Sequence, residues 1–63
     1  MKRILILQAE QRYRWQFRYK IDEVLDGDRR TIVDWQWCPF TREETIEQAK
    51  SRFGDFDSIE EAA

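Results

Sequence analysis

Five polar side chains on alternate positions of one stretch are the residues most able to bind a charged partner. They are Arg12, Arg14, Gln16, Arg18 and Lys20. Alternate positions of a β-strand lie about 6.8 Å apart on one face, close to the spacing of phosphates along a nucleic acid strand. Arginine is also enriched among the few residues that dominate the affinity of protein–protein interfaces. The stretch therefore predicts a binding face for a protein or a nucleic acid, and in the second case the Gln16 amide could read a base edge.

The side chains on which most enzymes and metal sites depend are missing or too few. The chain has no His, one Cys and two Gly, which excludes a Ser-His-Asp triad, a thiolate zinc site and a Gly-rich phosphate loop. The acidic residues around Gly27 lack the ligand spacing of a calcium-binding loop. We therefore expect a protein that is not an enzyme, with no catalytic residues, no metal and no cofactor.

Two features of the sequence indicate a cytoplasmic protein without membrane contacts. Cys38 is the only cysteine, so no disulfide can form within the chain, and a reducing compartment is expected. The one apolar run, Ile4–Leu7, is four residues long and far too short to cross a membrane.

The odd positions of the same stretch predict how the binding residues are held. They carry Tyr13, Trp15, Phe17, Tyr19 and Ile21. Period two places the odd and even sets on opposite faces of a β-strand, whereas a helix would mix them. A domain of 63 residues needs large side chains to bury enough surface, so we expect the aromatic face to be core. The alternative is that the aromatic residues form a platform on which nucleic acid bases stack.

Three antiparallel strands are predicted by the alternation and by the turn residues. We expect them over Lys2–Gln8, Arg12–Val24 and Arg30–Cys38, with Ala9–Gln11 as the first connection. A two-residue Asp26-Gly27 turn would place Asp34 on the aromatic face, so a loop of three or five residues is expected at Gly27. This register pairs Ile21 with Val33, Tyr19 with Trp35, Phe17 with Trp37, Lys20 with Asp34 and Arg18 with Gln36.

One helix is predicted after Pro39, which ends the sheet because it has no N–H to donate. Thr41 and Glu44 form a capping box before a helix over Arg42–Phe53, and Gly54 suits the left-handed position after it. The last segment, 55–63, is expected to be a frayed turn unless Ile59 docks on the core.

These elements predict one α+β domain over residues 1–63, a three-stranded antiparallel sheet (β-β-β-α) with a C-terminal helix packed on the aromatic face. The expected core consists of Tyr13, Trp15, Phe17, Tyr19, Val33, Trp35, Trp37, Ile46, Ala49 and Phe53. The first strand would leave an unpaired edge, through which a homodimer could form. The cationic face would stay open.

Charge is distributed unevenly along the chain. The net charge is −2, from 11 cations and 13 anions. Residues 1–20 hold six cations and one anion, whereas residues 21–63 hold five cations and twelve anions. A dedicated nucleic-acid binder is usually basic over the whole domain, so the net charge counts against that function. The alternative to any binding role is a solvated face with salt bridges to Asp34 and to the turn acids.

The segment 12–53 resembles the arm-type DNA-binding modules of phage integrases. The likeness rests on a strand with Trp15-Gln16-Phe17 and a helix start with Phe40-Thr41 and Glu43-Glu44. The resemblance implies DNA binding, and we keep as the alternative function a small DNA- or RNA-binding domain that uses the basic face of the sheet.

Our expected function is a non-catalytic interaction module for a protein partner. Phages and mobile elements encode many small chains of this composition as inhibitors or accessory proteins, among them anti-CRISPR proteins and host-polymerase inhibitors. Such a module would act by steric or electrostatic blocking, and we expect it to bind through Arg12, Arg14, Gln16, Arg18 and Lys20.

Overall fold

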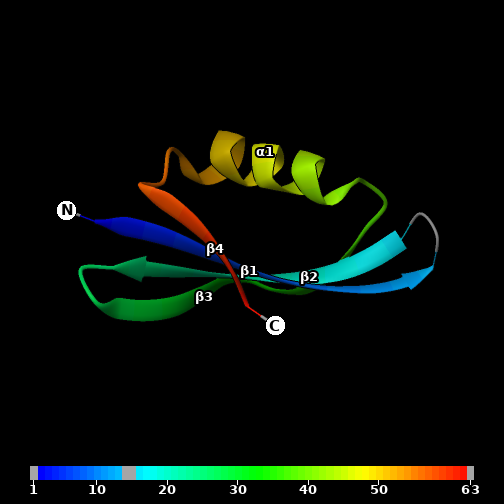
Figure 1. The fold of residues 1–63 in the computed structure, drawn as a ribbon, viewed down its shortest axis with the longest axis horizontal. Coiled ribbons are helices and arrows are strands. Elements are labelled where there is room, and N and C mark those ends of the chain that lie inside the picture. The colour runs from blue at the N-terminus through cyan, green and yellow to red at the C-terminus, as the bar shows by residue number, and fades with distance from the viewer. Residues whose placement is uncertain (1, 14–15, 63) are drawn as a thin grey trace.

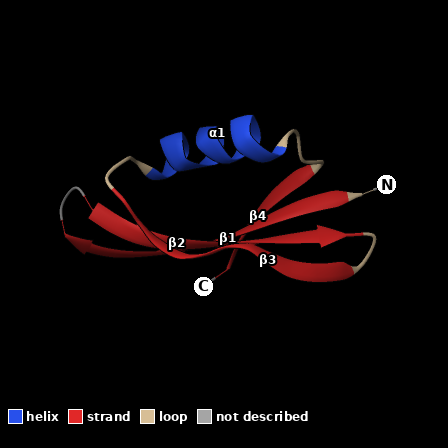
Figure 2. Ribbon diagram, turned by 180° about the vertical axis from the view of Figure 1, so that it is seen from behind, coloured by secondary structure: helices blue, strands red, loops and turns tan. Residues whose placement is uncertain are grey.

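Over residues 2–13 and 16–62, which are those that the computed structural model describes, the chain folds into a four-stranded sheet with one helix against it. At Tyr13 only the backbone is described. The elements in chain order are β1 (Arg3–Tyr13), β2 (Gln16–Leu25), β3 (Asp28–Cys38), α1 (Arg42–Phe53) and β4 (Ser58–Ala62). The strand order is β3-β2-β1-β4, and α1 lies along one face of the sheet (Figures 1 and 2). Within the described residues no element covers the other face, which we call the open face.

The fourth strand, β4, is the largest departure from the predicted fold. The sequence predicts three antiparallel strands, whereas β4 adds a parallel strand along Ile4–Gln8 of β1. The pairing starts where Arg3 and Asp57 bind each other twice. The Asp57 N–H donates to the Arg3 carbonyl oxygen at 2.9 Å, and the Arg3 N–H donates to Asp57 Oδ2 at 2.6 Å. Ile59 then packs against the core, which is the condition that the sequence sets for an ordered C-terminal segment.

β1 is consequently a central strand. It pairs with β2 on one side and with β4 on the other, so β4 occupies the edge that was expected to stay unpaired along Lys2–Gln8. The outer strands of the sheet are β3 and β4. β1 also continues through Ala9–Gln11, the segment predicted as a connection, and β2 begins only at Gln16. Arg12 therefore lies in β1 and not in the second strand.

The turn between β2 and β3 is shorter than expected. Leu25 pairs with Asp28, which leaves a two-residue turn at Asp26 (φ 50°) and Gly27 (φ 90°). Positive φ at both positions is what a type I′ hairpin turn requires, and Asp-Gly is one of its preferred sequences. The predicted loop of three or five residues is wrong.

Two bulges in β3 then change the register. Asp22 pairs with Thr31 while Ile21 pairs with Val33, so Ile32 is one extra residue of β3. This bulge is why the predicted Ile21–Val33 pair is nevertheless correct. A second shift lies between the pairs of Ile21 and Tyr19 and adds one more residue of β3. Lys20 of β2 and Asp34 of β3 lie within this shift. Beyond it the predicted pairs are wrong, and the observed pairs are Tyr19 with Gln36, Arg18 with Trp37 and Phe17 with Cys38.

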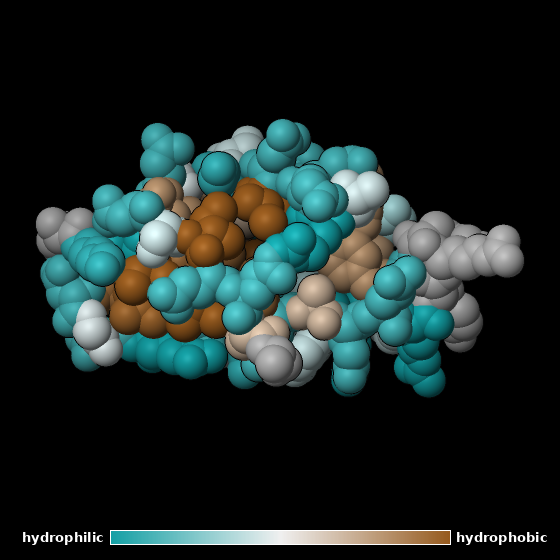
Figure 3. Space-filling view, in the orientation of Figure 1, coloured by the Kyte–Doolittle hydropathy of each residue, from teal (hydrophilic) through white to brown (hydrophobic). Residues whose placement is uncertain are grey.

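The core lies between α1 and the sheet, and its centre is aliphatic. Leu5, Leu7 and Ile21 are the largest fully buried side chains. Of the predicted core residues, Phe17, Val33 and Ala49 are buried, and Tyr19, Ile46 and Phe53 are partly exposed and pack against the core. Figure 3 shows other hydrophobic side chains gathered around β1 and β4 on the surface, as expected for a domain too small to enclose all of them.

Trp35 and Trp37 are not core residues. They are 40% and 46% exposed, because the second bulge turns both indoles away from α1. A strand alternates its side chains with period two, so one extra residue moves every later side chain to the opposite face. The predicted core positions Trp15 and the side chain of Tyr13 lie outside the described residues.

The helix begins and ends where the sequence predicts. The Glu44 N–H donates to Thr41 Oγ1 at 3.2 Å, and the Gly54 N–H donates to the Lys50 carbonyl oxygen at 2.9 Å, with Gly54 at φ 92°. These contacts satisfy backbone groups that a helix otherwise leaves without partners at its two ends. In the described chain no helix is both long and apolar enough to cross a membrane.

Candidate interaction surface on the open face

The open face holds predicted cationic residues together with the two exposed tryptophans. Phe17 and Ile21 of β2 are buried against α1, so the even positions of β2 lie on the open face. Trp37 of β3 pairs with Arg18 of β2 and shares that face. We call the following four residues the Trp–Arg strip: Arg12, Arg18, Trp35 and Trp37.

Each indole of the strip lies under a guanidinium from another strand. Arg18 Cζ is 4.7 Å from the centroid of the Trp35 ring, and Arg12 Cζ is 5.7 Å from that of Trp37. Both distances fall within the range of cation–π attraction. Arg18 Nε also donates to the carboxylate of Glu10 on β1. Three strands therefore fix the positions of these side chains before any partner binds.

A hollow adjoins this strip. It has a volume of about 400 Å³ and is lined by Glu10, Gln11, Arg12, Arg18 and Trp37. Its walls combine an indole, two guanidinium groups and a carboxylate. Such a hollow can receive a polar or aromatic side chain of a partner.

At the other end of the open face, Asp22 and Arg29 balance each other's charge. Its carboxylate accepts hydrogen bonds from Arg29 Nε at 2.7 Å and from Thr31 Oγ1 at 2.8 Å, and the residue is only 4% exposed. Burial acts to raise the pKa of Asp22, but the hydrogen bonds from Thr31 and Arg29 outweigh it and hold the pKa below its ordinary value. The ionised carboxylate is thus compensated within the sheet.

Two further cations of the open face are Arg12 and Lys20, and the charge of Lys20 contributes to the lowered pKa of Asp22. Neither Arg12 nor Lys20 forms an ion pair within the part of the chain that the structure describes. Arg18, in contrast, is compensated by Glu10. The face is therefore not the continuous cationic surface that the alternation predicts, because carboxylates stand among its cations.

The structure brings together only part of the predicted site. Arg12 and Arg18 lie in the Trp–Arg strip, and Gln16 and Lys20 flank Arg18 on β2. Arg14 lies outside the described residues. Sequence reasoning missed Glu10, and it placed both tryptophans in the core. The spacing of Trp35 and Trp37 shows that they share a face, but only the bulge decides which face.

Nothing in the described chain forms a metal site, since no three His, Cys, Asp or Glu side chains come together in residues 2–13 and 16–62. Comparison with known proteins adds no assignment, because no family model, no curated protein and no solved structure matches the chain.

Proposed function

We propose that this chain is a non-catalytic interaction module that binds a protein partner through the Trp–Arg strip. The observation that carries the proposal is the exposure of Trp35 and Trp37, at 40% and 46%, on an uncovered sheet face. A domain of 63 residues depends on large side chains for its core. Two tryptophans placed outside that core are available for another purpose, and Trp and Arg are the residues most enriched at interface hot spots.

Preorganisation supports the same function. The stacked guanidinium groups of Arg12 and Arg18 restrict the rotamers of the indoles, and Glu10 restricts Arg18 in turn. A side chain that is already ordered loses less entropy when a partner arrives, so more of its contact energy appears as affinity. The role that fits a small module of this kind is to block a surface of its partner, as inhibitors and accessory proteins of phages and mobile elements do.

Nucleic acid binding is the second candidate, and one observation favours it. Indoles beside cations are the elements of single-strand recognition, in which bases stack on aromatic rings and Arg or Lys binds phosphate. Against it, the net charge is −2 and the sequence pI is about 5.0. Arg18 is already compensated by Glu10. The protein partner is therefore the better-supported proposal.

The test compares two double variants that remove the same kinds of side chain. Trp35→Ser with Arg18→Ser alters the strip, and Phe40→Ser with Lys50→Ser removes an exposed aromatic residue and a cation on the helix side. A partner is first identified by photo-crosslinking from the open face, and its affinity is then measured with purified components by calorimetry. We expect the strip variant to weaken binding by about 30-fold or more, while the helix-side variant binds like the wild type.

Two results would contradict the protein-partner proposal. One is equal binding of the purified partner by the strip variant and the wild type. The other comes from mobility-shift titrations with single-stranded DNA, RNA and duplex DNA. Binding at micromolar protein that weakens steeply between roughly 50 and 200 mM salt, and that the strip variant loses, would assign the face to nucleic acid.

A further inference from the structure

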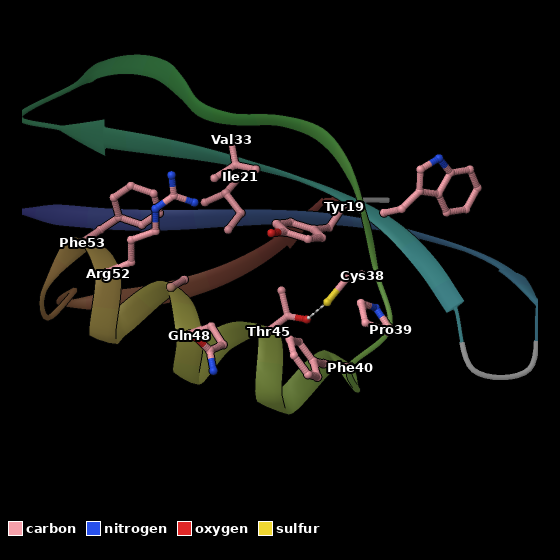
Figure 4. Close-up of a pocket in the computed structure, with 12 residues that line it drawn as sticks. Tyr19, Ile21, Val33, Cys38, Pro39, Phe40, Thr45, Gln48, Arg52 and Phe53 are labelled. Atoms are coloured by element: carbon pink, nitrogen blue, oxygen red, sulfur yellow. Dashed lines mark hydrogen bonds between the residues drawn. The ribbon is translucent and has the colours of Figure 1, made fainter.

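On the other side of the sheet, a cavity lies between α1 and the strands β2 and β3. It has a volume of about 190 Å³, and Figure 4 shows Tyr19, Ile21 and Val33 of the sheet on one side and Phe53 of the helix on the other. Ala49 of the helix also lines it. The sheet side is built from residues of the core, and Ile21 and Val33 are 2% and 4% exposed. The cavity is thus a continuation of the core that the helix does not fill.

At one end of the cavity the polar groups satisfy each other. Thr45 Oγ1 lies 3.2 Å from Cys38 Sγ, and it donates to the Thr41 carbonyl oxygen at 2.9 Å. Figure 4 shows the Thr45–Cys38 contact beside Pro39. The buried Thr45 hydroxyl and Cys38 thiol therefore require no ligand, and the exposed Gln48 is the other polar side chain of the helix that lines the cavity beside Arg52.

At the other end a cation points into the cavity. Figure 4 shows the guanidinium of Arg52 extending from α1 toward the sheet, next to Phe53 and Ile21. Arg52 Cζ lies 5.1 Å from the centroid of the Phe53 ring. Its charge reaches Tyr19, whose pKa is raised by burial and by Cys38 and lowered in part by Arg52.

Arg52 differs from most arginines of the described chain in having no carboxylate partner there. The arginines that do form ion pairs are Arg3, Arg18, Arg29, Arg30 and Arg42. Arg52 is exposed to solvent, and at the mouth of the cavity its guanidinium can bind a carboxylate through charge-assisted hydrogen bonds, two of which can form in parallel. Charge complementarity therefore identifies an anionic head group.

The volume limits the size of the ligand. An apolar cavity of about 150 Å³ suffices to bind benzene, whereas pockets for larger ligands occupy roughly 300–1,000 Å³. At about 190 Å³ this cavity holds a single ring and little more.

We propose that this cavity binds a small monocyclic aromatic carboxylate, with the ring against Ile21 and Val33 and the carboxylate on Arg52. The site lies on the helix side of the sheet. Trp37 of the Trp–Arg strip also lines the cavity, but the proposal goes beyond the function assigned to the open face and does not depend on it.

The probe is phenylacetate, titrated into the ¹⁵N-labelled full-length protein and followed by NMR. We expect saturable shifts at millimolar ligand that centre on Val33, Cys38 and Ala49. Arg52→Gln should weaken phenylacetate binding by at least about tenfold and leave the affinity for benzyl alcohol, a neutral analogue, unchanged. Lys50→Gln removes the same charge from an exposed position of α1 that does not line the cavity, and it should bind phenylacetate like the wild type.

Each of three results would overturn the assignment. Equal phenylacetate affinity in Arg52→Gln and the wild type would show that Arg52 does not bind the carboxylate. Tighter binding of N-acetyl-phenylalaninamide than of phenylacetate would assign the cavity to an aromatic side chain of a protein partner. Shifts at the same residues that depend on protein concentration alone would assign it to a second copy of this chain.

Discussion

Arg3 joins segments that are far apart in the sequence. Its guanidinium donates to Glu23 Oε1 at 2.9 Å, to the Phe53 carbonyl oxygen at 2.9 Å and to the Asp55 carbonyl oxygen at 3.1 Å. It also stacks on Phe56, with Cζ 4.4 Å from the ring centroid. The carbonyl groups lie at the C-terminal end of α1, where a cation is favourable. One side chain of β1 thus holds β2, the end of the helix and the segment before β4.

We expect Arg3→Ala to lower the free energy of unfolding by about 2–4 kcal/mol, because it removes one of two cations from a carboxylate that is 4% exposed. Arg30 Nη2 remains 3.3 Å from Glu23 Oε2 and limits the loss. Urea denaturation measures the change. Lys50→Ala serves as the exposed control and should stay within about 0.5 kcal/mol of the wild type. An effect of Arg3→Ala as small as that of the control would contradict this role.

The buried carboxylates of Asp22 and Glu23 also make stability depend on pH. The hydrogen bond from Arg3 lowers the pKa of Glu23, against the effect of burial and with help from Arg30. The pKa of Asp22 is lowered as well. A lowered pKa means that the folded state binds fewer protons than the unfolded state in acid, so stability is lost as the pH falls. The contribution is complete above the ordinary values of 4.5 and 3.8 and is lost as the pH falls from them through the lowered values of the folded state.

Urea midpoints measured from neutral pH down to about pH 3 should therefore fall on acidification. Glu23→Gln cannot ionise, so it should be less stable than the wild type at neutral pH and should lose less on acidification. A midpoint that stays constant or rises below pH 4.5 would contradict the assignment of these two carboxylates.

At the scale of single elements, β3 offers a direct test of the register. Trp35 is 40% exposed on the open face, so Trp35→Ala should cost no more than about 1 kcal/mol of unfolding free energy. A buried Trp would cost about 3–5 kcal/mol. Ile21→Ala, at a residue that is 2% exposed, is the reference for a core truncation and should cost about 2–5 kcal/mol. A larger loss at Trp35 than at Ile21 would mean that the bulge does not turn Trp35 outward.

The elements differ in how far the sequence could predict them, and the cause is the range of the interactions that define each one. The helix bounds Arg42–Phe53 were predictable because Thr41 and Gly54 act within one turn of α1. The bulges of β3 were not, since the short Asp26-Gly27 turn shifts the register by one residue, the first bulge restores the predicted Ile21–Val33 pair, and the second bulge shifts the register again. β4 was not predicted either, because its anchor is the contact between Asp57 and Arg3, 54 residues apart.

The candidate site was predictable in its cations and not in its aromatic residues. Arg12 and Arg18 belong to an alternation of cationic and aromatic residues that can be read from neighbouring positions. The structure places both beside the strip indoles. Trp35 and Trp37 depend on the register, which the sequence pattern alone leaves open to a shift of one residue. The two faces of the sheet therefore differ in composition. The helix side is stabilised by aliphatic residues, and the open face carries the tryptophans.

At the scale of the whole molecule, β4 closes the sheet beside its most apolar strand. It covers the edge of β1 along Ile4–Gln8, and Glu61 of β4 forms an ion pair with Arg42 at the start of α1. Without β4, unpaired N–H and C=O groups would lie beside the apolar run Ile4–Leu7. An exposed apolar edge of this kind is a template for pairing with another chain.

A chain shortened to end at Gly54 should therefore be less stable and should self-associate, because both the Arg3–Asp57 contact and the parallel strand are lost. Light scattering after size-exclusion chromatography should show a mass above the monomer that rises with concentration. Full-length Ile59→Ala separates the two causes, since it loses side chain packing but keeps the backbone pairing of β4. It should be destabilised without associating. A shortened chain that stays monomeric and unfolds at the wild-type urea midpoint would show that β4 does not protect this edge.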